Sequence, residues 1–181
     1  MSKKIKVGIH QPNFFPWLGY FYKINKSTDF VFLDNVQIEL GSKQAYVNRV
    51  SINSHSGPVQ INCPISKEKS ISKSISDIEY VTKYDWRKKQ LKTIYFNYIK
   101  SVHFKEIYPF IEELIRNETQ NLSDFNINII SQIVKKLEIE TSLHTASKMS
   151  LKSEEKNERI IEICKELGSD IYLSGKGGLK Y

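Results

Sequence analysis

The stretch Val7–Tyr20, with the sequence VGIHQPNFFPWLGY, decides the fold of this 181-residue chain. The β-branched run over residues 5–9 predicts a strand. Pro12 ends this strand because proline has no backbone N–H to donate, and Pro16 fits the first turn of a helix. We expect that helix over residues 16–26. The stretch therefore predicts a strand, a short rigid turn and a helix.

The turn carries three polar side chains among aromatic ones: His10, Gln11 and Asn13. In an open α/β sheet, ligands bind at the carboxyl ends of the strands, and a helix N-terminus offers backbone N–H groups to an anion. The alternative is that His10 is a buried histidine satisfied by the backbone, and that Phe14, Phe15 and Trp17 are core residues. We favour a binding site, because polar groups that converge in an apolar setting are typical of one.

The two ends of the chain share one pattern. Residues 29–34 (DFVFLD) predict a buried strand, and a strand, a helix and a strand within about thirty residues are typical of a parallel pair. Near the C-terminus, residues 141–145 and 170–173 predict strands around a helix that Ser153 caps and Gly168 ends. The expected fold is α/β, with a parallel, Rossmann-like core built from two segments: residues 5–34 and 141–174.

The middle of the chain has a different pattern. Short β-rich runs predict antiparallel hairpins inserted over residues 36–82: 36–39, 45–52, 59–65 and 78–81. Apolar residues at helical spacing predict a three-helix segment over residues 84–138, with Pro109 starting or bending the second helix. The serines and lysines of residues 67–76 predict a mobile loop. We expect one domain over residues 1–181 and, because the chain stops just after a strand, a further segment downstream.

Further candidate residues follow from this topology. The last strand runs into a glycine-rich turn whose amides and single lysine suit a phosphate or carboxylate: Ser174, Gly175, Lys176, Gly177 and Gly178. Because parallel strands deliver their carboxyl ends to one edge, we expect this turn beside His10. Other expected substrate-binding residues, three of them at the pocket mouth, are Tyr20, Asp34, Asn48 and Arg49. For Arg49 a surface ion pair is an equal alternative.

Composition narrows the class of partner. The net charge is +7, with scattered lysines that fit an anionic small molecule such as a nucleotide or nucleotide sugar. Nucleic acid ranks last, because the basic residues do not interleave with aromatic ones along any one element. Cys63 and Cys164 lack zinc-ligand spacing, and no cofactor can be assigned. Without a signal segment or membrane-length apolar stretch, we expect a cytoplasmic protein with no membrane insertion; a homo-oligomer is left open.

Several motifs together resemble the WbqC-like family of bacterial surface-polysaccharide gene clusters. They are GIHQPNFFPWLGYFYKI, DFVFLD, YVNRVSI…GPVQINCPI, DWRKKQLKTIYFNYI with HFKEIYPFIEELI, and ERIIEICKELGSDIYLSGKGGLKY. The likeness covers nearly the whole chain. It implies a role in building O-antigen or related glycans, through attachment of an acyl or aminoacyl group to an amino sugar. Members of the family are usually longer, which agrees with the expected downstream segment.

The strand, proline turn and helix N-terminus also resemble the layout of HIGH-type nucleotidylyltransferases. Trp17–Tyr20 takes the place of the HIGH tetrad of those enzymes. It keeps the glycine of that tetrad, but it lacks both histidines. Unless His10 and Gln11 take over their role, nucleotidyl transfer is not supported. Residues 148–153 (KMSLKS) resemble the lysine–serine loop of that superfamily with one residue too many, and we interpret them as a chance match.

Two functions remain open. One is a transferase or ligase that forms an amide on a nucleotide-activated amino sugar, with His10 as a general base near its ordinary pKa. Gln11 and Asn13 would orient the substrate, and Lys176 with the neighbouring amides would hold an anion. The other is a non-catalytic binding or scaffold subunit of a glycan-assembly complex, with a partner surface of exposed aromatics near Phe14, Phe15 and Tyr20. Whether His10 and the glycine-rich turn meet discriminates between the two.

Overall fold

The structure is a computed structural model that describes residues 4–38, 46–81 and 84–175. These residues form two compact units. The first unit contains both ends of the chain, and the second contains the middle: residues 13–15 and 36–132. The sequence-based prediction that the whole chain forms a single domain stays a prediction.

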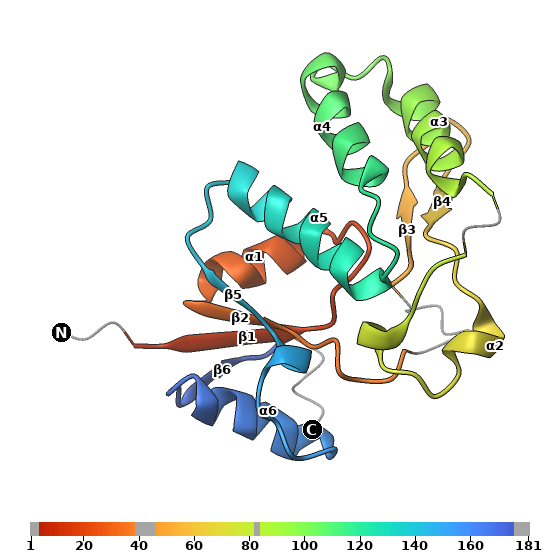
Figure 1. Cartoon of the computed structure of the whole chain (residues 1–181). Coiled ribbons are helices and arrows are strands. Elements are labelled where there is room, and N and C mark those ends of the chain that lie inside the picture. Colours follow the sequence, from red (N-terminus) through yellow and green to blue (C-terminus); the bar gives the residue numbers. More distant parts are fainter. Residues whose placement is uncertain (1–3, 39–45, 82–83, 176–181) are drawn as a thin grey trace. The chain divides into compact units, whose positions relative to one another are not determined.

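A parallel sheet forms the centre of the first unit (Figure 1). Its strands, in the spatial order β5–β2–β1–β6, are β5 Ser142–Thr145, β2 Asp29–Phe32, β1 Lys6–His10 and β6 Ile171–Leu173. His10 is the partner of Phe32 in β2, and Gly8 is the partner of Leu173 in β6. The predicted α/β fold with a parallel core is confirmed.

The strand order contains one reversal. From β1 the chain builds outward to β2 and then β5, and it returns to place β6 on the other side of β1. This is the order of the first four strands of a doubly wound sheet, in which ligands bind outside the carboxyl ends of the strands at the reversal. In this chain the reversal lies between β1 and β6.

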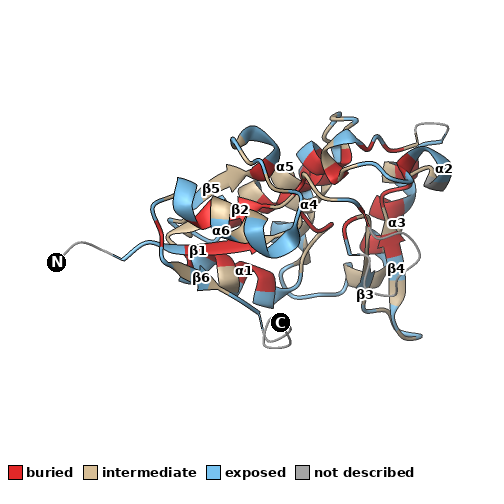
Figure 2. Ribbon diagram, turned by 90° about the horizontal axis from the view of Figure 1, so that it is seen from below, coloured by how far each residue is buried: buried red, intermediate tan, exposed pale blue. Residues whose placement is uncertain are grey.

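Helices cover both faces of the sheet, α1 (Leu18–Lys26) on one and α6 (Lys156–Glu166) on the other (Figure 1). On the α6 face, Val7 and Ile9 pack with Ile163 in one buried cluster. On the α1 face, the Phe30 ring lies 5.4 Å from that of Tyr20. Because both faces are covered, β1 is buried along most of its length (Figure 2).

The helix ends differ in detail from their prediction. The helix predicted from residue 16 begins at Leu18, with Trp17 at the N-cap. Ser153 does not cap α6; the carboxylate of Glu155 does, accepting a 2.8 Å hydrogen bond from the backbone N–H of Glu158. Gly168 ends α6 as predicted, at a φ of +65° that L side chains rarely adopt.

The second unit contains one β-hairpin and most of the helices. Strand β3 (Arg49–Ile52) pairs antiparallel with β4 (Val59–Asn62). The helices are α2 Lys67–Ser70, α3 Trp86–Tyr98, α4 Phe104–Arg116 and α5 Leu122–Lys136, and α5 leads back into the first unit. None of the helices within the described part of the chain is long and apolar enough to cross a bilayer.

One local prediction for the second unit is wrong. The expected mobile loop over residues 67–76 contains α2, and Ile75 is fully buried at the start of the short helix η1 (Ile75–Asp77). A single buried isoleucine leaves little signal in the local pattern. The helix expected to start or bend at Pro109 begins five residues earlier, at Phe104, and contains Pro109 in its interior. It therefore does not start at Pro109, and the bend stays a prediction.

Candidate functional site

The carboxyl ends of β1 and β6 meet at the reversal of the sheet. Pairing between the two strands ends at Gly8 and Leu173, so Ser174 and Gly175 leave β6 at the edge where β1 ends in His10. The structure therefore brings the start of the glycine-rich turn to the same edge as His10. The remaining candidates in that turn lie outside the described residues: Lys176, Gly177 and Gly178.

His10 is held by its neighbours on α1 and by the turn. Its Nδ1 lies 3.2 Å from the carbonyl oxygen of Gln11, so Nδ1 donates and Nε2 is left as the proton acceptor. The imidazole packs edge-on against Tyr20, at 5.0 Å between ring centroids, and against Trp17, at 5.9 Å. The side chain of Gln11 has no hydrogen-bond partner within the described part of the chain, and it stays a candidate for orienting a substrate.

The pKa of His10 is lowered from its ordinary value to about 4. Burial is the largest cause, the nearby charge of Lys23 adds to it, and the hydrogen bond to Gln11 opposes it. At neutral pH His10 is thus a neutral imidazole. The sequence-based prediction that His10 keeps its ordinary, near-neutral pKa is therefore wrong. The pKa is lower because the aromatic rings around His10 keep water away from it.

Lys23 is a site residue that the sequence reasoning missed. Its Nζ donates a 2.7 Å hydrogen bond to the carbonyl oxygen of Ile9 and lies 5.5 Å from the ring centre of Tyr172 in β6. Burial lowers the pKa of Lys23 to about 8. The available signal was its position three residues after Tyr20, which places it on the buried face of α1.

Lys23 links the ends of the two strands. It contacts the backbone of β1 directly before His10, and its ammonium group lies over a side chain of β6. Burial raises the pKa of Tyr172, and a hydrogen bond with Ser174 partly opposes this. Ser174 also donates a 3.1 Å hydrogen bond to the carbonyl of Gly175. His10, Lys23, Tyr172 and Ser174 therefore converge at the reversal, and we call them the reversal site.

Asp34 lies at the same edge of the sheet, two residues after β2. The neighbouring Leu33 donates a 2.9 Å backbone hydrogen bond to the carbonyl of His10. The buried Asp34 carboxylate accepts two hydrogen bonds of 2.8 Å, from the backbone N–H and the hydroxyl of Ser147. These contacts favour a structural role, in which Asp34 holds the turn after β5, and its predicted role in binding stays a prediction.

Three other candidates belong to the second unit. Asn13 is 2 % exposed, and its Nδ2 has no hydrogen-bond partner among the residues that the structure describes. Asn48 donates a 3.2 Å hydrogen bond to the carbonyl of Cys63. Arg49 begins β3, where it is partly buried opposite Asn62. Their expected contribution to the site stays a prediction.

The expected partner surface of exposed aromatics near Phe14, Phe15 and Tyr20 stays a prediction. Phe14 and Tyr20 are buried, and the Tyr20 hydroxyl donates a 3.0 Å hydrogen bond to the carbonyl of Gln11. Tyr20 thus supports the turn, while its predicted contact with the substrate stays a prediction.

Phe15, partly buried, has a φ of +44°, a conformation that costs on the order of 1–3 kcal/mol for such a residue.

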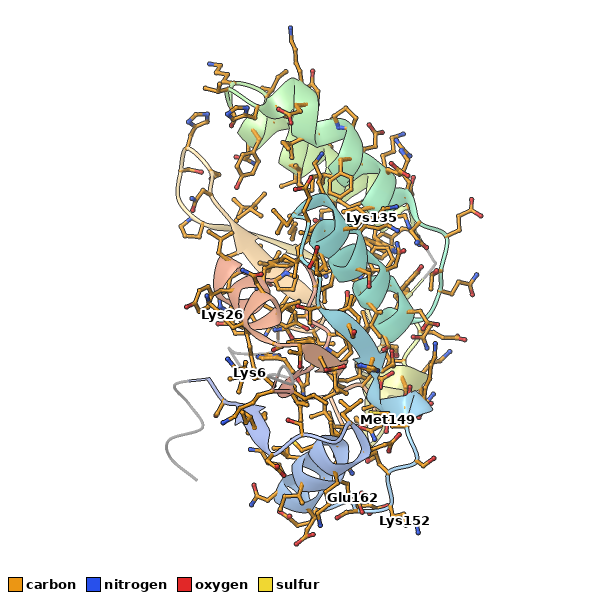
Figure 3. All side chains as sticks on the ribbon, turned by 90° about the vertical axis from the view of Figure 1, so that its left-hand side faces the viewer. Lys6, Lys26, Lys135, Met149, Lys152 and Glu162 are labelled. Atoms are coloured by element: carbon orange, nitrogen blue, oxygen red, sulfur yellow. The ribbon has the colours of Figure 1, made fainter. Side chains whose placement is uncertain are left out.

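An open hollow of about 660 Å³ lies at the opposite edge of the sheet, where the strands begin. Lys6 and Lys26, both labelled in Figure 3, line it together with Asp29 and Glu140. Cationic and anionic groups are mixed there, and the negative end of the α1 dipole points to it. This edge therefore suits an anion less well than the reversal site does.

The described residues contain no group of three or more His, Cys, Asp or Glu side chains placed to hold a metal ion. Both cysteines are buried free thiols. The chemistry that the reversal site offers is thus that of a neutral imidazole, an ammonium group and hydroxyl and amide donors. These groups are suited to binding an anion and to accepting a proton.

The strand order and the reversal site define a doubly wound type of α/β protein with a polar site at the switch point. The chain matches the WbqC-like protein family over residues 11–181 and belongs to that family. It is similar to the uncharacterized protein Rv1507c of Mycobacterium tuberculosis, with 29 % identity over 177 residues that cover 97 % of this chain and 74 % of that protein. No solved structure shows a significant match.

Proposed function

We propose that this protein is a transferase or ligase of surface-polysaccharide assembly that attaches an acyl or aminoacyl group to a nucleotide-activated amino sugar. Membership of the WbqC-like family supports the setting. The observation that carries the proposal is the pair formed by His10 and Lys23 at the reversal of a doubly wound sheet. That is the place where such sheets bind nucleotides.

The charge state of this pair favours an anionic ligand. Burial lowers the pKa of both groups, so that each holds a proton less readily than in water. A diphosphate placed beside them stabilises both cationic forms and raises both pKa values. The ligand therefore supplies the negative charge that the reversal site lacks.

The same arrangement gives His10 a role in amide formation. The amine of the sugar attacks the carbonyl carbon of an activated acyl donor, the C–N bond forms, and the bond to the leaving group breaks. Nε2 of His10 takes the proton that the amine loses and passes it to the leaving group. Binding of the diphosphate shifts the pKa of His10 from about 4 toward neutrality, where such transfer is efficient.

Neighbouring groups hold the substrate. The N-terminus of α1 follows the turn directly, has no side-chain cap, and presents backbone N–H groups to a phosphate. Ser174 and the Gln11 amide add neutral donors. At Gly19 an added Cβ would lie 2.8 Å from the indole Nε1 of Trp17, so the Trp17 ring would have to shift.

Thermal unfolding with uridine diphosphate, and then with other nucleoside diphosphates, tests the proposal. We expect a nucleoside diphosphate to raise the melting temperature of the wild type. Lys23→Gln should lose this shift, while Lys26→Gln, which removes the same charge from the exposed side of α1, should keep it. Equal shifts in the wild type and Lys23→Gln would contradict the role of Lys23.

The second candidate, a non-catalytic subunit, is favoured by one observation. Helix α1 exposes Leu18 and Tyr22, at 85 % and 64 % of their surface. An assay with an amino-sugar nucleotide and an activated acyl donor separates the candidates. Amide formation that His10→Gln abolishes supports the enzyme, whereas nucleotide binding with no turnover supports the subunit.

A further inference from the structure

The turn between α3 and α4 exposes apolar side chains at the end of a helical hairpin in the second unit. We call residues 96–107 the hairpin tip. Its large exposed apolar residues, with the exposed share of each, are Phe96 (61 %), Ile99 (43 %), Val102 (92 %) and Ile107 (38 %). Residues 99–103 are all exposed. An apolar group as exposed as Val102 gains free energy by leaving water.

The hairpin tip is a preformed surface. The ring of Tyr95 meets those of Phe104 and Tyr108 at 5.4 and 5.5 Å between centroids, and the latter two stack at 4.7 Å. The turn is closed by a 2.8 Å backbone hydrogen bond from Ser101 to Tyr98. A ligand therefore meets a fixed arrangement of side chains, and little ordering is required on binding.

Positive charges predominate at the hairpin tip. Residues 86–105 contain six basic side chains and no acidic one: Arg87, Lys88, Lys89, Lys92, Lys100 and Lys105. Lys92, Lys100 and Lys105 are exposed within or beside the tip. The tip contains one acidic residue, Glu106, whose carboxylate lies 3.6 Å from His103. The surface thus combines exposed apolar groups with a clear excess of positive charge.

We propose that the hairpin tip docks this protein on the surface of an anionic lipid membrane. Basic residues near such a surface are attracted by the acidic headgroups, and exposed aliphatic and aromatic groups enter the boundary with the acyl chains. Helices α3 and α4 have 13 residues each, too short to span a bilayer, so the tip lies on the membrane.

Two other occupants fit the surface less well. A second copy of the chain would bring two runs of like charge together across a symmetric interface, which is unfavourable. Single-stranded nucleic acid would match the charge, but bases stack on aromatic rings and not on aliphatic side chains. Three of the four large exposed apolar residues of the tip are aliphatic, and Phe96 is the exception.

Co-sedimentation of the full chain with vesicles tests the proposal. We expect binding to phosphatidylcholine vesicles that contain phosphatidylglycerol. This binding should be lost in about 0.5 M salt, because salt at that concentration screens surface charges. The double variant Lys100→Gln and Lys105→Gln should bind about thirtyfold more weakly. The same change at Lys69 and Lys73, exposed in the same unit but outside the tip, should have a smaller effect.

The apolar part is tested separately. Val102→Asp should weaken vesicle binding about tenfold, while Ile71→Asp, at a residue that is also exposed but outside the tip, should leave it nearly unchanged. Equal binding by both variants would overturn the proposal. So would concentration-dependent dimerisation that Val102→Asp abolishes, or binding of single-stranded RNA in place of vesicles.

Discussion

The ammonium group of Lys23 donates a hydrogen bond of 2.7 Å to the carbonyl oxygen of Ile9, the residue directly before His10. This contact ties helix α1 to the end of β1 at the point where pairing with β6 has stopped. It also sets a cation beside an imidazole that burial keeps neutral. The electrostatics of the site therefore depend on these neighbouring groups together.

Removal of the Lys23 charge should raise the pKa of His10. The charge is the second cause of the lowered value, and burial, the larger cause, remains in Lys23→Gln. We expect the pKa to rise above 4 and to stay below 6.5. A histidine NMR titration measures this, with Lys26→Gln as the matched control. An unchanged pKa in Lys23→Gln would show that the two groups do not interact.

The free energy of unfolding should fall as the pH drops from 6.5 to about 4. In this window the unfolded chain, with its ordinary histidine pKa, binds more protons than the folded chain at His10. The loss due to His10 is at most about 3 kcal/mol and smaller to the extent that solvent reaches the ring. Urea unfolding across this range should give a steeper fall for the wild type than for His10→Gln. Equal slopes would exclude a lowered pKa at His10.

Gly8→Ala should destabilise the first unit. An added Cβ would collide with the hydroxyl of Ser27 at the end of α1 and would lie 2.9 Å from a ring carbon of Phe30. Overpacking of this kind costs about 1–3 kcal/mol. Gly175→Ala is the control, because a Cβ there meets nothing within 4 Å. Equal melting temperatures for the two variants would show that α1 does not approach β1 so closely.

Asp34→Ala should cost about 2 kcal/mol, because it removes the buried, charged acceptor of two hydrogen bonds, from the N–H and the hydroxyl of Ser147. Asp34→Asn keeps one oxygen for that N–H and should cost less. Alanine at the exposed Asp170 is the control for a lost carboxylate. A structural role for Asp34 predicts that the loss of stability in urea unfolding is largest for Asp34→Ala, smaller for Asp34→Asn and smallest for the Asp170→Ala control. A stable Asp34→Ala that loses only ligand binding would instead support the predicted binding role.

The sequence predicts the parallel core well, because its β-branched runs alternate with helical periods at both ends of the chain. It places the end of α6 at Gly168 for a local reason, since the helix closes there with a positive φ. It misplaces the cap of α6, because Ser153 is a preferred N-cap residue type and Glu155 is not. In the structure the helix begins at Lys156, so Glu155 occupies the N-cap position.

The candidate site is less predictable than the fold. His10 is found from the sequence because it interrupts an apolar strand beside two prolines. Lys23 is not, since a lysine on a helix normally faces solvent, and its burial comes from β1 and β6, which are distant in sequence. The lowered pKa of His10 likewise comes from rings and charges that only the folded chain brings together.

The most direct test of the account is an NMR titration of His10 with and without saturating uridine diphosphate. We predict a pKa of about 4 for the free protein and a clear rise when the nucleotide is bound, because the diphosphate stabilises the imidazolium. Lys23→Gln should weaken nucleotide binding, so that a higher nucleotide concentration is needed to produce the same rise in the pKa of His10. A nucleotide that binds without changing the pKa of His10 would contradict an anion site at the reversal of the sheet.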